Sequence, residues 1–165
     1  MTGAGGEARD LTLPAGGGVL NVRVGAIIRR GGAVLMVGGD ALDYYYSVGG
    51  RIRFGETAEQ AVLREVEEET GVRLEIDRLG FIHEDFFTGD LGEFSGRPVH
   101  EIGFYFYMKV PEDFEPVCGS MAVDGSAEHL IWVPLDAEKT IYPTFFRTDL
   151  DRPAPGVVHI VTDER

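Results

Sequence analysis

Hydrophobic and polar positions along the chain alternate in a way that predicts a fold built mainly of strands. Runs of aliphatic, aromatic and β-branched residues, separated by glycine and proline turns, predict strands at 20–28, 33–37, 44–48, 78–87, 101–110, 129–133 and 157–161. Residues 30–32 form a turn between the first two, and Gly49 and Gly50 end the third. The aromatic-rich run 101–110 is typical of a central strand.

One segment has the pattern of a helix, from about Thr57 to Thr70. Thr57 and Gln60, three residues apart, predict a capping box at its start. Gly71 is well placed to end it in a left-handed conformation. Strands, a helix, more strands and helical turns between Pro134 and about Leu150 predict an α/β fold, in which helices cover a mixed sheet.

The chain has 165 residues, which predicts a single domain at 19–165 behind a flexible, glycine-rich N-terminal tail at 1–18. Its N-terminus lacks a signal-peptide pattern, and no apolar run is long enough to span a membrane. These features predict a cytoplasmic protein. Cys118 is the single cysteine, which excludes an internal disulfide and a cysteine cluster that binds zinc.

The net charge of −13 makes the chain a poor match for a nucleic-acid backbone or an anionic membrane. It would also repel a phosphorylated small molecule. Such a ligand could still bind if divalent cations lay between its phosphates and the carboxylates of the protein.

The run REVEEETGV, residues 64–72, carries four glutamates near the end of the predicted helix. Like charges three or four positions apart on a helix repel by about 0.2–0.5 kcal/mol per pair. At about 100° per residue, Glu65, Glu68 and Glu69 fall within an arc of about 100°, whereas Glu67 points to solvent. This arc borders the apolar stripe of Ala58, Val62 and Val66. Three such carboxylates suit a hard ion, Mg²⁺ or Mn²⁺; the alternative is a charged surface helix.

The wider segment GRIRFGETAEQAVLREVEEETGV, residues 50–72, resembles the Nudix box, G-x5-E-x7-R-E-U-x-E-E-x-G-U, where U is a bulky aliphatic residue. Every specified position is filled, and the surrounding strands are similar to those of the family. The resemblance implies a Nudix-type α/β/α sandwich with the loop and helix of the box on one face of a mixed sheet. It also implies a metal-dependent hydrolase that cleaves a nucleoside diphosphate linked to another group.

The resemblance further implies roles for individual residues. Glu65, Glu68 and Glu69 would bind or adjoin the Mg²⁺ or Mn²⁺ ions, together with the carbonyl group of Gly49 or Gly50. A second pair, Glu56 and Arg64, would hold the loop against the helix. Many family members have a proline where this chain has Val48, and its loss lowers the rigidity of the loop without removing a ligand.

The general base and the substrate contacts are less constrained by the sequence. Glu65 is one candidate base, and among the later acids Glu84, Glu93, Glu101 and Glu128 we favour Glu128 as a base or an additional metal ligand. Candidate substrate contacts are Tyr46, Arg51, His83 and Phe87. The histidines show no metal-binding spacing.

Several alternatives stay open from the sequence. A Nudix-fold sensor would bind a nucleotide derivative without turnover, a Nudix-fold isomerase would rearrange a diphosphate compound, and an acidic structural domain would bind no metal. The substrate could be ADP-ribose, a dinucleoside polyphosphate, a nucleotide sugar or an oxidised nucleoside triphosphate. A homodimer is also possible, since dimers are frequent in the family.

Overall fold

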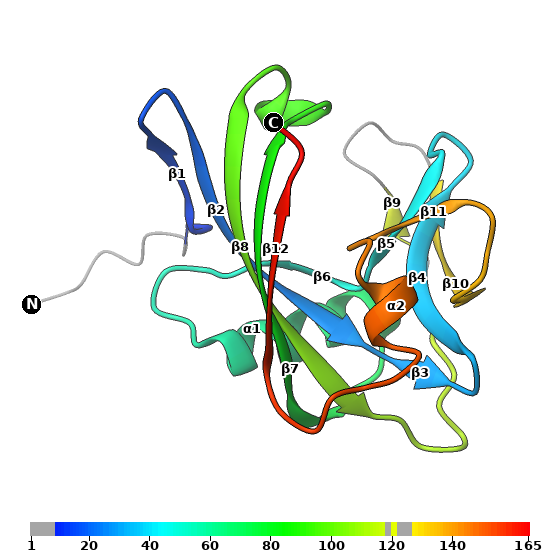
Figure 1. Cartoon of the computed structure of the whole chain (residues 1–165). Helices are drawn as coiled ribbons and strands as arrows, with labels where there is room; N and C mark the ends of the chain where they lie inside the picture. Colours follow the sequence, from blue (N-terminus) through cyan, green and yellow to red (C-terminus); the bar gives the residue numbers. More distant parts are fainter. Residues whose placement is uncertain (1–8, 118–119, 122–126) are drawn as a thin grey trace, which may run out of the picture.

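The computed structural model describes residues 9–117, 120–121 and 127–165 (Figure 1). Cys118 and the first eight residues of the expected tail lie outside the described residues. Within the described part of the chain, no helix is both long and apolar enough to cross a bilayer.

The first sheet has six strands: β1 (Thr12–Ala15), β2 (Gly18–Ile27), β6 (Gly49–Arg51), β7 (Glu75–Thr88), β8 (Pro98–Lys109) and β12 (Val158–Asp163). Their order is β1-β2-β8-β7-β12, and β6 also pairs with β2. The pairs β2–β8 and β7–β12 are parallel, and the others are antiparallel. The predicted central strand, β8, therefore lies in the middle of a mixed sheet.

The second sheet also has six strands: β3 (Arg29–Arg30), β4 (Ala33–Gly39), β5 (Tyr44–Ser47), β9 (Ser120–Met121), β10 (Ala127–Pro134) and β11 (Thr140–Tyr142). Their order is β11-β5-β4-β10-β9, and β3 pairs with β4. Figure 1 shows that the two sheets diverge, with the short helix α2 (Phe146–Asp149) between them.

The long helix α1 (Ala58–Thr70) begins at the predicted capping box: Thr57 Oγ1 accepts from the Gln60 N–H, and Gln60 Oε1 accepts from the Thr57 N–H. It ends at Gly71, whose φ of 71° lies in the left-handed region. A 3₁₀ turn, η1 (Gly92–Phe94), lies in the connection between β7 and β8.

The two helices pack into different hydrophobic clusters. Ala61, Val62 and Val66 of α1 join one cluster with residues of β2, β4 and β8. Phe146 of α2 joins the other cluster, with Tyr105 of β8 and Phe81 of β7. Helices and strands thus pack as the mixed α/β fold that the sequence predicts.

All seven predicted strands and the box helix are present. Some begin or end at other residues than predicted, and the structure contains additional short strands. Residues 12–15, expected in the tail, form β1 and pair with β2, so the tail is shorter than predicted. The strands lie in two sheets rather than one. The segment after Pro134 contains β11 as well as a helix, and that helix is only four residues long. The residues of β1 and β11 are too few to show a periodic pattern.

Candidate active site

The loop before α1 lies directly on the first sheet because two glycines allow close approach. Gly49 pairs with Gly25 of β2, and Gly50 pairs with Val24. Gly49 has a φ of 146°, and a Cβ atom there would lie 2.2 Å from the carbonyl oxygen of Val24. Only glycine fits this position. The loop therefore holds the start of the box against β2.

Arg64 fixes the other side of this loop. Its Nε donates to Glu56 Oε1 at 2.7 Å, and its Nη2 donates to Glu56 Oε2 at 3.0 Å. Nη2 also donates to the Arg51 carbonyl oxygen at 3.1 Å, while Glu56 Oε2 accepts from the Arg53 N–H at 3.0 Å. The hydrogen bonds from Arg64 lower the pKa of Glu56. The Glu56–Arg64 pair that the box implies is thus present, and it connects loop to helix.

Arg64 also offsets the repulsion within the glutamate run. Its Nη1 donates to Glu65 Oε1 at 2.5 Å and to Glu68 Oε2 at 3.2 Å. Arg53 approaches Glu68 from the loop, at 3.7 Å. Glu67 lies away from this group and pairs with Arg73 at 2.8 Å. One guanidinium therefore serves as counter-ion to two carboxylates that the sequence assigns to metal binding.

Glu69 is the most unusual carboxylate of the run. Burial raises its pKa to about 8, and the charges of Glu65 and Glu128 act in the same direction. Its Oε1 accepts only a long hydrogen bond, 3.4 Å, from the Gly49 N–H. Its buried Oε2 has no hydrogen-bond partner among the residues that the structure describes. A buried carboxylate oxygen without a donor is unfavourable, and a cation would relieve it.

The donors around Glu69 fit a hard divalent cation, although they are not assembled as a finished metal centre. Among the described residues, no three histidine, cysteine, aspartate or glutamate side chains already lie in a metal-binding arrangement. The Glu65 carboxylate lies over Gly50, where an added Cβ would be only 2.5 Å from its Cδ. Oxygen donors on a rigid helix, with space kept by glycine, suit Mg²⁺ or Mn²⁺.

Tyr46 and Glu128 approach the same region from the second sheet. Tyr46 lies in β5 and Glu128 in β10. Burial and a hydrogen bond with Glu128 raise the pKa of the Tyr46 hydroxyl, and the charge of Glu69 adds to this effect. The structure therefore brings Glu69, Glu128 and Tyr46 together from three separate elements.

Arg51 is held by residues from two other segments. It lies at the end of β6, where its guanidinium pairs with Glu93 and lies 3.7 Å from Asp10. The guanidinium also lies over the Phe94 ring, 4.9 Å from its centroid. The β7–β8 connection, which includes η1, thus contacts the box through Arg51.

His83 and Phe87 are placed differently from the other candidate contacts. His83 is only 3% exposed, packs its ring 5.0 Å from that of Phe145, and makes a 2.8 Å hydrogen bond with Thr162. It is a core residue, so the expected contact with a ligand has no support in this position. Phe87 is half-buried at the end of β7, where it pairs with Val99.

A row of polar residues on the first sheet was not predicted from the sequence. Asn21 of β2, Glu101 of β8 and Asp85 of β7 are neighbours in register, so their side chains share one face. Asn21 Nδ2 donates to Glu101 Oε2 at 2.8 Å, and Arg23 Nη1 lies 3.9 Å from Glu101 Oε1. The signal in the sequence is the alternation of Asn21 and Arg23 with apolar residues in LNVRV.

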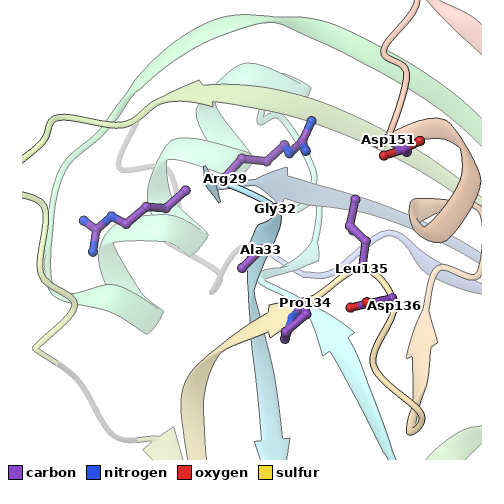
Figure 2. A pocket seen from close by; sticks show the side chains of 8 residues that line it. Arg29, Gly32, Ala33, Pro134, Leu135, Asp136 and Asp151 are labelled. Atoms are coloured by element: carbon purple, nitrogen blue, oxygen red, sulfur yellow. The ribbon is translucent and has the colours of Figure 1, made fainter.

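Another hollow in the molecule is separate from the box. It is a pocket with a volume of about 540 Å³. Figure 2 shows it beside the β3–β4 hairpin. Its lining consists of Arg29, Arg30, Gly32, Ala33, Pro134, Leu135, Asp136 and Asp151. Arg29 and Arg30 donate to the carbonyl oxygens of Leu150 and Phe114, so both arginines serve the fold here. None of the lining residues belongs to the box.

Comparison with known proteins identifies the fold. The family model described as NUDIX domain matches residues 19–149. The Mutator MutT protein from Bacillus halodurans has a similar structure, with a TM-score of 0.64, 18% identity, and coverage of 87% of this chain and 91% of that one. The MutT NUDIX hydrolase from Burkholderia pseudomallei has a TM-score of 0.57 and 25% identity, and covers 78% and 95% of the two chains.

A third solved structure, an ADP-ribose pyrophosphatase from Streptococcus suis, has a TM-score of 0.54 and 17% identity, over 86% of this chain and 98% of that one. No curated protein matches the sequence. The family model covers most of the chain, and the match includes the whole box. The chain therefore belongs to the Nudix family of hydrolases, which act on diphosphate bonds.

Proposed function

We propose that this Nudix hydrolase is a metal-dependent pyrophosphohydrolase whose substrate is a nucleoside diphosphate linked to a second group. The observation that carries the proposal is the buried Glu69 carboxylate beside Glu65, one oxygen of which has no donor among the described residues. A structural domain has no use for such an arrangement, because it costs stability. A site for a cation gives the arrangement a purpose.

Glu65, Glu68, Glu69 and the carbonyl group of Gly49 or Gly50 would hold the cation, which we propose to be Mg²⁺ or Mn²⁺. When bound, it would offset the charge of the diphosphate and lower the pKa of the attacking water. The acidic character of the chain, with a net charge of −13, favours such a cation, because it would offset the repulsion of a phosphorylated substrate.

In the proposed reaction, a water oxygen forms a bond to one phosphorus of the diphosphate. The bond between that phosphorus and the bridging oxygen breaks, and the second phosphate leaves with the bridging oxygen. The proton of the water passes to a carboxylate. Glu128 suits this role because its hydrogen bond with Tyr46 orients it and it lies close enough to Glu69 to influence that group; Glu65 is the second candidate.

Arg64 and Glu56 contribute by positioning rather than by contact with the reacting atoms. Their two hydrogen bonds keep the loop with Gly49 and Gly50 at a fixed distance from α1. Phosphoryl transfer depends mainly on such positioning and on electrostatic stabilisation.

The test is release of phosphate esters from a panel of diphosphate compounds, with Mg²⁺ or Mn²⁺ and alkaline phosphatase as coupling enzyme. The panel should hold a dinucleoside polyphosphate, a nucleotide sugar, an oxidised nucleoside triphosphate and ADP-ribose, the last because one similar structure is an ADP-ribose pyrophosphatase. We expect Glu68→Gln to lower turnover by about 10²–10³-fold. Glu67→Gln is the matched control, because Glu67 pairs outward with Arg73.

Equal rates for wild type and Glu68→Gln would refute the assigned site. Binding of a compound without any product would favour a sensor. Conversion to an isomer without release of a phosphate ester would favour an isomerase. The absence of any effect of metal on activity or stability would return the glutamate run to a charged surface helix.

A further inference from the structure

Arg23 is a charged residue in the middle of β2, and the proposed reaction leaves it without a role. Its neighbours in register are Gly103 of β8 and Arg51 of β6. The side chain is 23% exposed, so part of it reaches solvent. Burial lowers the pKa of Arg23, but the charge of Glu101 and, to a smaller extent, those of Glu69 and Glu65 raise it. Arg51, its partner in register, follows Gly50, over which the Glu65 carboxylate lies. Arg23 therefore borders the site proposed for the cation.

The hydrogen-bonding capacity of Arg23 is almost unused. A guanidinium carries five N–H donors. Among the residues that the structure describes, none accepts a hydrogen bond from the Arg23 side chain, and its buried Nε has no partner. In the described part of the chain, the nearest carboxylate oxygen is Glu101 Oε1, 3.9 Å from Nη1, which is beyond hydrogen-bond distance. Glu101 supplies a compensating charge without meeting these donors.

The groups around Arg23 are tightly packed and fixed in position. The ring of Tyr105 occupies the volume above Gly25 and Gly103, since a Cβ at either glycine would lie within 2.7 Å of a ring carbon. Tyr105 is 2% exposed and hydrogen-bonds to Ser47, which fixes its ring. Arg23 thus lies beside a rigid aromatic ring and a fixed carboxylate, Glu101, which accepts from Asn21.

The other arginines near Arg23 already form ion pairs with carboxylates. Arg51 pairs with Glu93 and Asp10, and Arg64 pairs with Glu56, Glu65 and Glu68. Arg53 lies 3.7 Å from Glu68, but its side chain is 41% exposed, so water can meet its donors. Among the arginines of the described residues beside the box, Arg23 is the one with a buried donor, Nε, that lacks an acceptor. The ligand that would satisfy it must carry several acceptor oxygens and a negative charge, and must lie next to the carboxylates of α1.

We infer that Arg23 binds a non-bridging phosphate oxygen of the substrate, from the face of the first sheet that carries Asn21, Glu101 and Tyr105. This inference rests on the proposed function, since it assigns the ligand of Arg23 to the diphosphate of that substrate. A guanidinium fits a phosphate because two parallel N–H groups can meet two of its oxygens. Arg23 would thereby hold the diphosphate from the side opposite the carboxylates.

The test is the dissociation constant for inorganic pyrophosphate in the presence of Mg²⁺, measured by isothermal titration calorimetry. Arg23→Met is expected to weaken binding by about 10- to 100-fold, the usual effect of losing a charge-assisted hydrogen bond. Arg78→Met is the matched control with the same change in charge. Arg78 donates to the Ala154 carbonyl oxygen and lies over the Tyr107 ring, away from the box, so its variant should bind within about twofold of wild type.

A second measurement separates recognition from structural damage. The rise in melting temperature on addition of Mg²⁺ should persist in Arg23→Met, because the carboxylates are unchanged. If that rise is lost in Arg23→Met, the test uses Arg23→Lys instead. Lysine keeps the positive charge but lacks the planar guanidinium, so Arg23→Lys should still bind pyrophosphate severalfold more weakly than wild type.

The inference would be overturned if Arg23→Met bound pyrophosphate with wild-type affinity. If Arg23→Lys is used instead, wild-type affinity in that variant would overturn it too. Failure of the wild-type protein to bind pyrophosphate would overturn it as well. The proposed function is judged independently, by turnover of the substrate panel and its loss in Glu68→Gln.

Discussion

Arg64 shows how much one side chain can organise. Its guanidinium contacts Glu56, Glu65 and Glu68 and the backbone of Arg51, and only 18% of the side chain is exposed. The resemblance to the Nudix box implies the pair with Glu56. It does not predict that the same group reaches the carboxylates assigned to metal binding, because that depends on the rotamers of the folded loop.

We expect Arg64→Met to lower the free energy of unfolding by about 2–4 kcal/mol, since it leaves two partly buried carboxylates without a cation. Urea denaturation without metal would measure this change. The control is Arg73→Met. Arg73 pairs with Glu67 at the surface, and the Arg73 side chain is 85% exposed. A change below about 0.5 kcal/mol in Arg64→Met, like that expected of the control, would contradict this account.

Gly50 is a second residue whose identity the site requires. We expect Gly50→Ala to displace the Glu65 carboxylate, because the new Cβ would lie 2.5 Å from its Cδ. The stabilising effect of Mg²⁺ should then fall by more than half, measured as the shift in melting temperature. Gly32→Ala is the control, since nothing lies within 4 Å of a Cβ there. An unchanged shift in Gly50→Ala would show that Glu65 does not depend on this space.

Asp85 lies opposite Glu101, and the two acids form a like-charged pair across β7 and β8. Burial, followed by the charges of Glu101 and Glu164, raises the pKa of Asp85 to about 7. A hydrogen bond from the Phe86 backbone and the charge of Arg23 act in the opposite direction. In the unfolded chain the pKa of the same group is about 3.9.

Between those two pKa values the unfolded chain has released the proton of Asp85 and the folded chain has kept it. The contribution of Asp85 to stability therefore falls as the pH rises from about 4 to 7. Asp85→Asn removes this pH-dependent loss of stability. After allowance for solvent screening, we expect the free energy of unfolding of Asp85→Asn to exceed that of wild type by on the order of 1 kcal/mol at pH 8, and by less at pH 5. Urea denaturation at both values tests this, with the exposed Asp77→Asn as control. A constant difference between the two pH values would refute it.

The elements differ in how far the sequence determines them. The box helix is predictable to its capping residues because its signals are local: Thr57 with Gln60 at one end, and Gly71 at the other. Long strands such as β2 and β8 are also predictable from their apolar runs. The division of the strands into two sheets is not, because pairs such as β5 with β11 join residues almost 100 positions apart in sequence. The short strands β1, β6, β9 and β11 have only two to four residues, too few to show a periodic pattern, so the sequence does not reveal them.

The capping box makes a measurable contribution to α1. We expect Thr57→Ala to lower the free energy of unfolding by about 1 kcal/mol, because the Gln60 N–H loses its acceptor and the reciprocal bond is weakened. Thr57→Ser keeps the hydroxyl and should restore most of the loss. Chemical denaturation of the three proteins measures both effects, and equal stability of the alanine and serine variants would exclude a role for the cap.

At the scale of the whole molecule, charge is the dominant property. The chain carries 28 acidic and 15 basic residues, and its buried Glu69 adds a local cost. The sequence alone indicates that a phosphorylated ligand could bind if divalent cations lay between its phosphates and the carboxylates of the protein. It does not reveal Arg23 as a further positive group, since one arginine in a strand looks the same whether or not its donors are satisfied.

Metal binding should therefore stabilise the folded chain. A divalent cation at 100 times its dissociation constant adds about 2.7 kcal/mol, which for 165 residues raises the melting temperature by about 5–10 °C. Differential scanning fluorimetry with Mg²⁺ and with a chelator measures this shift. Glu69→Gln should lose most of it, and an equal shift in Glu69→Gln would exclude that residue as a ligand.

The position of Arg64 has a consequence for the order of events as the protein is made. Many small metal-binding domains fold only when the ion arrives, because nothing else balances their ligands. Here a guanidinium already lies between Glu65 and Glu68. Under the proposed function, the newly synthesised chain would complete its fold first and acquire the ion later. A temporary shortage of metal would then leave an inactive enzyme that the returning ion restores.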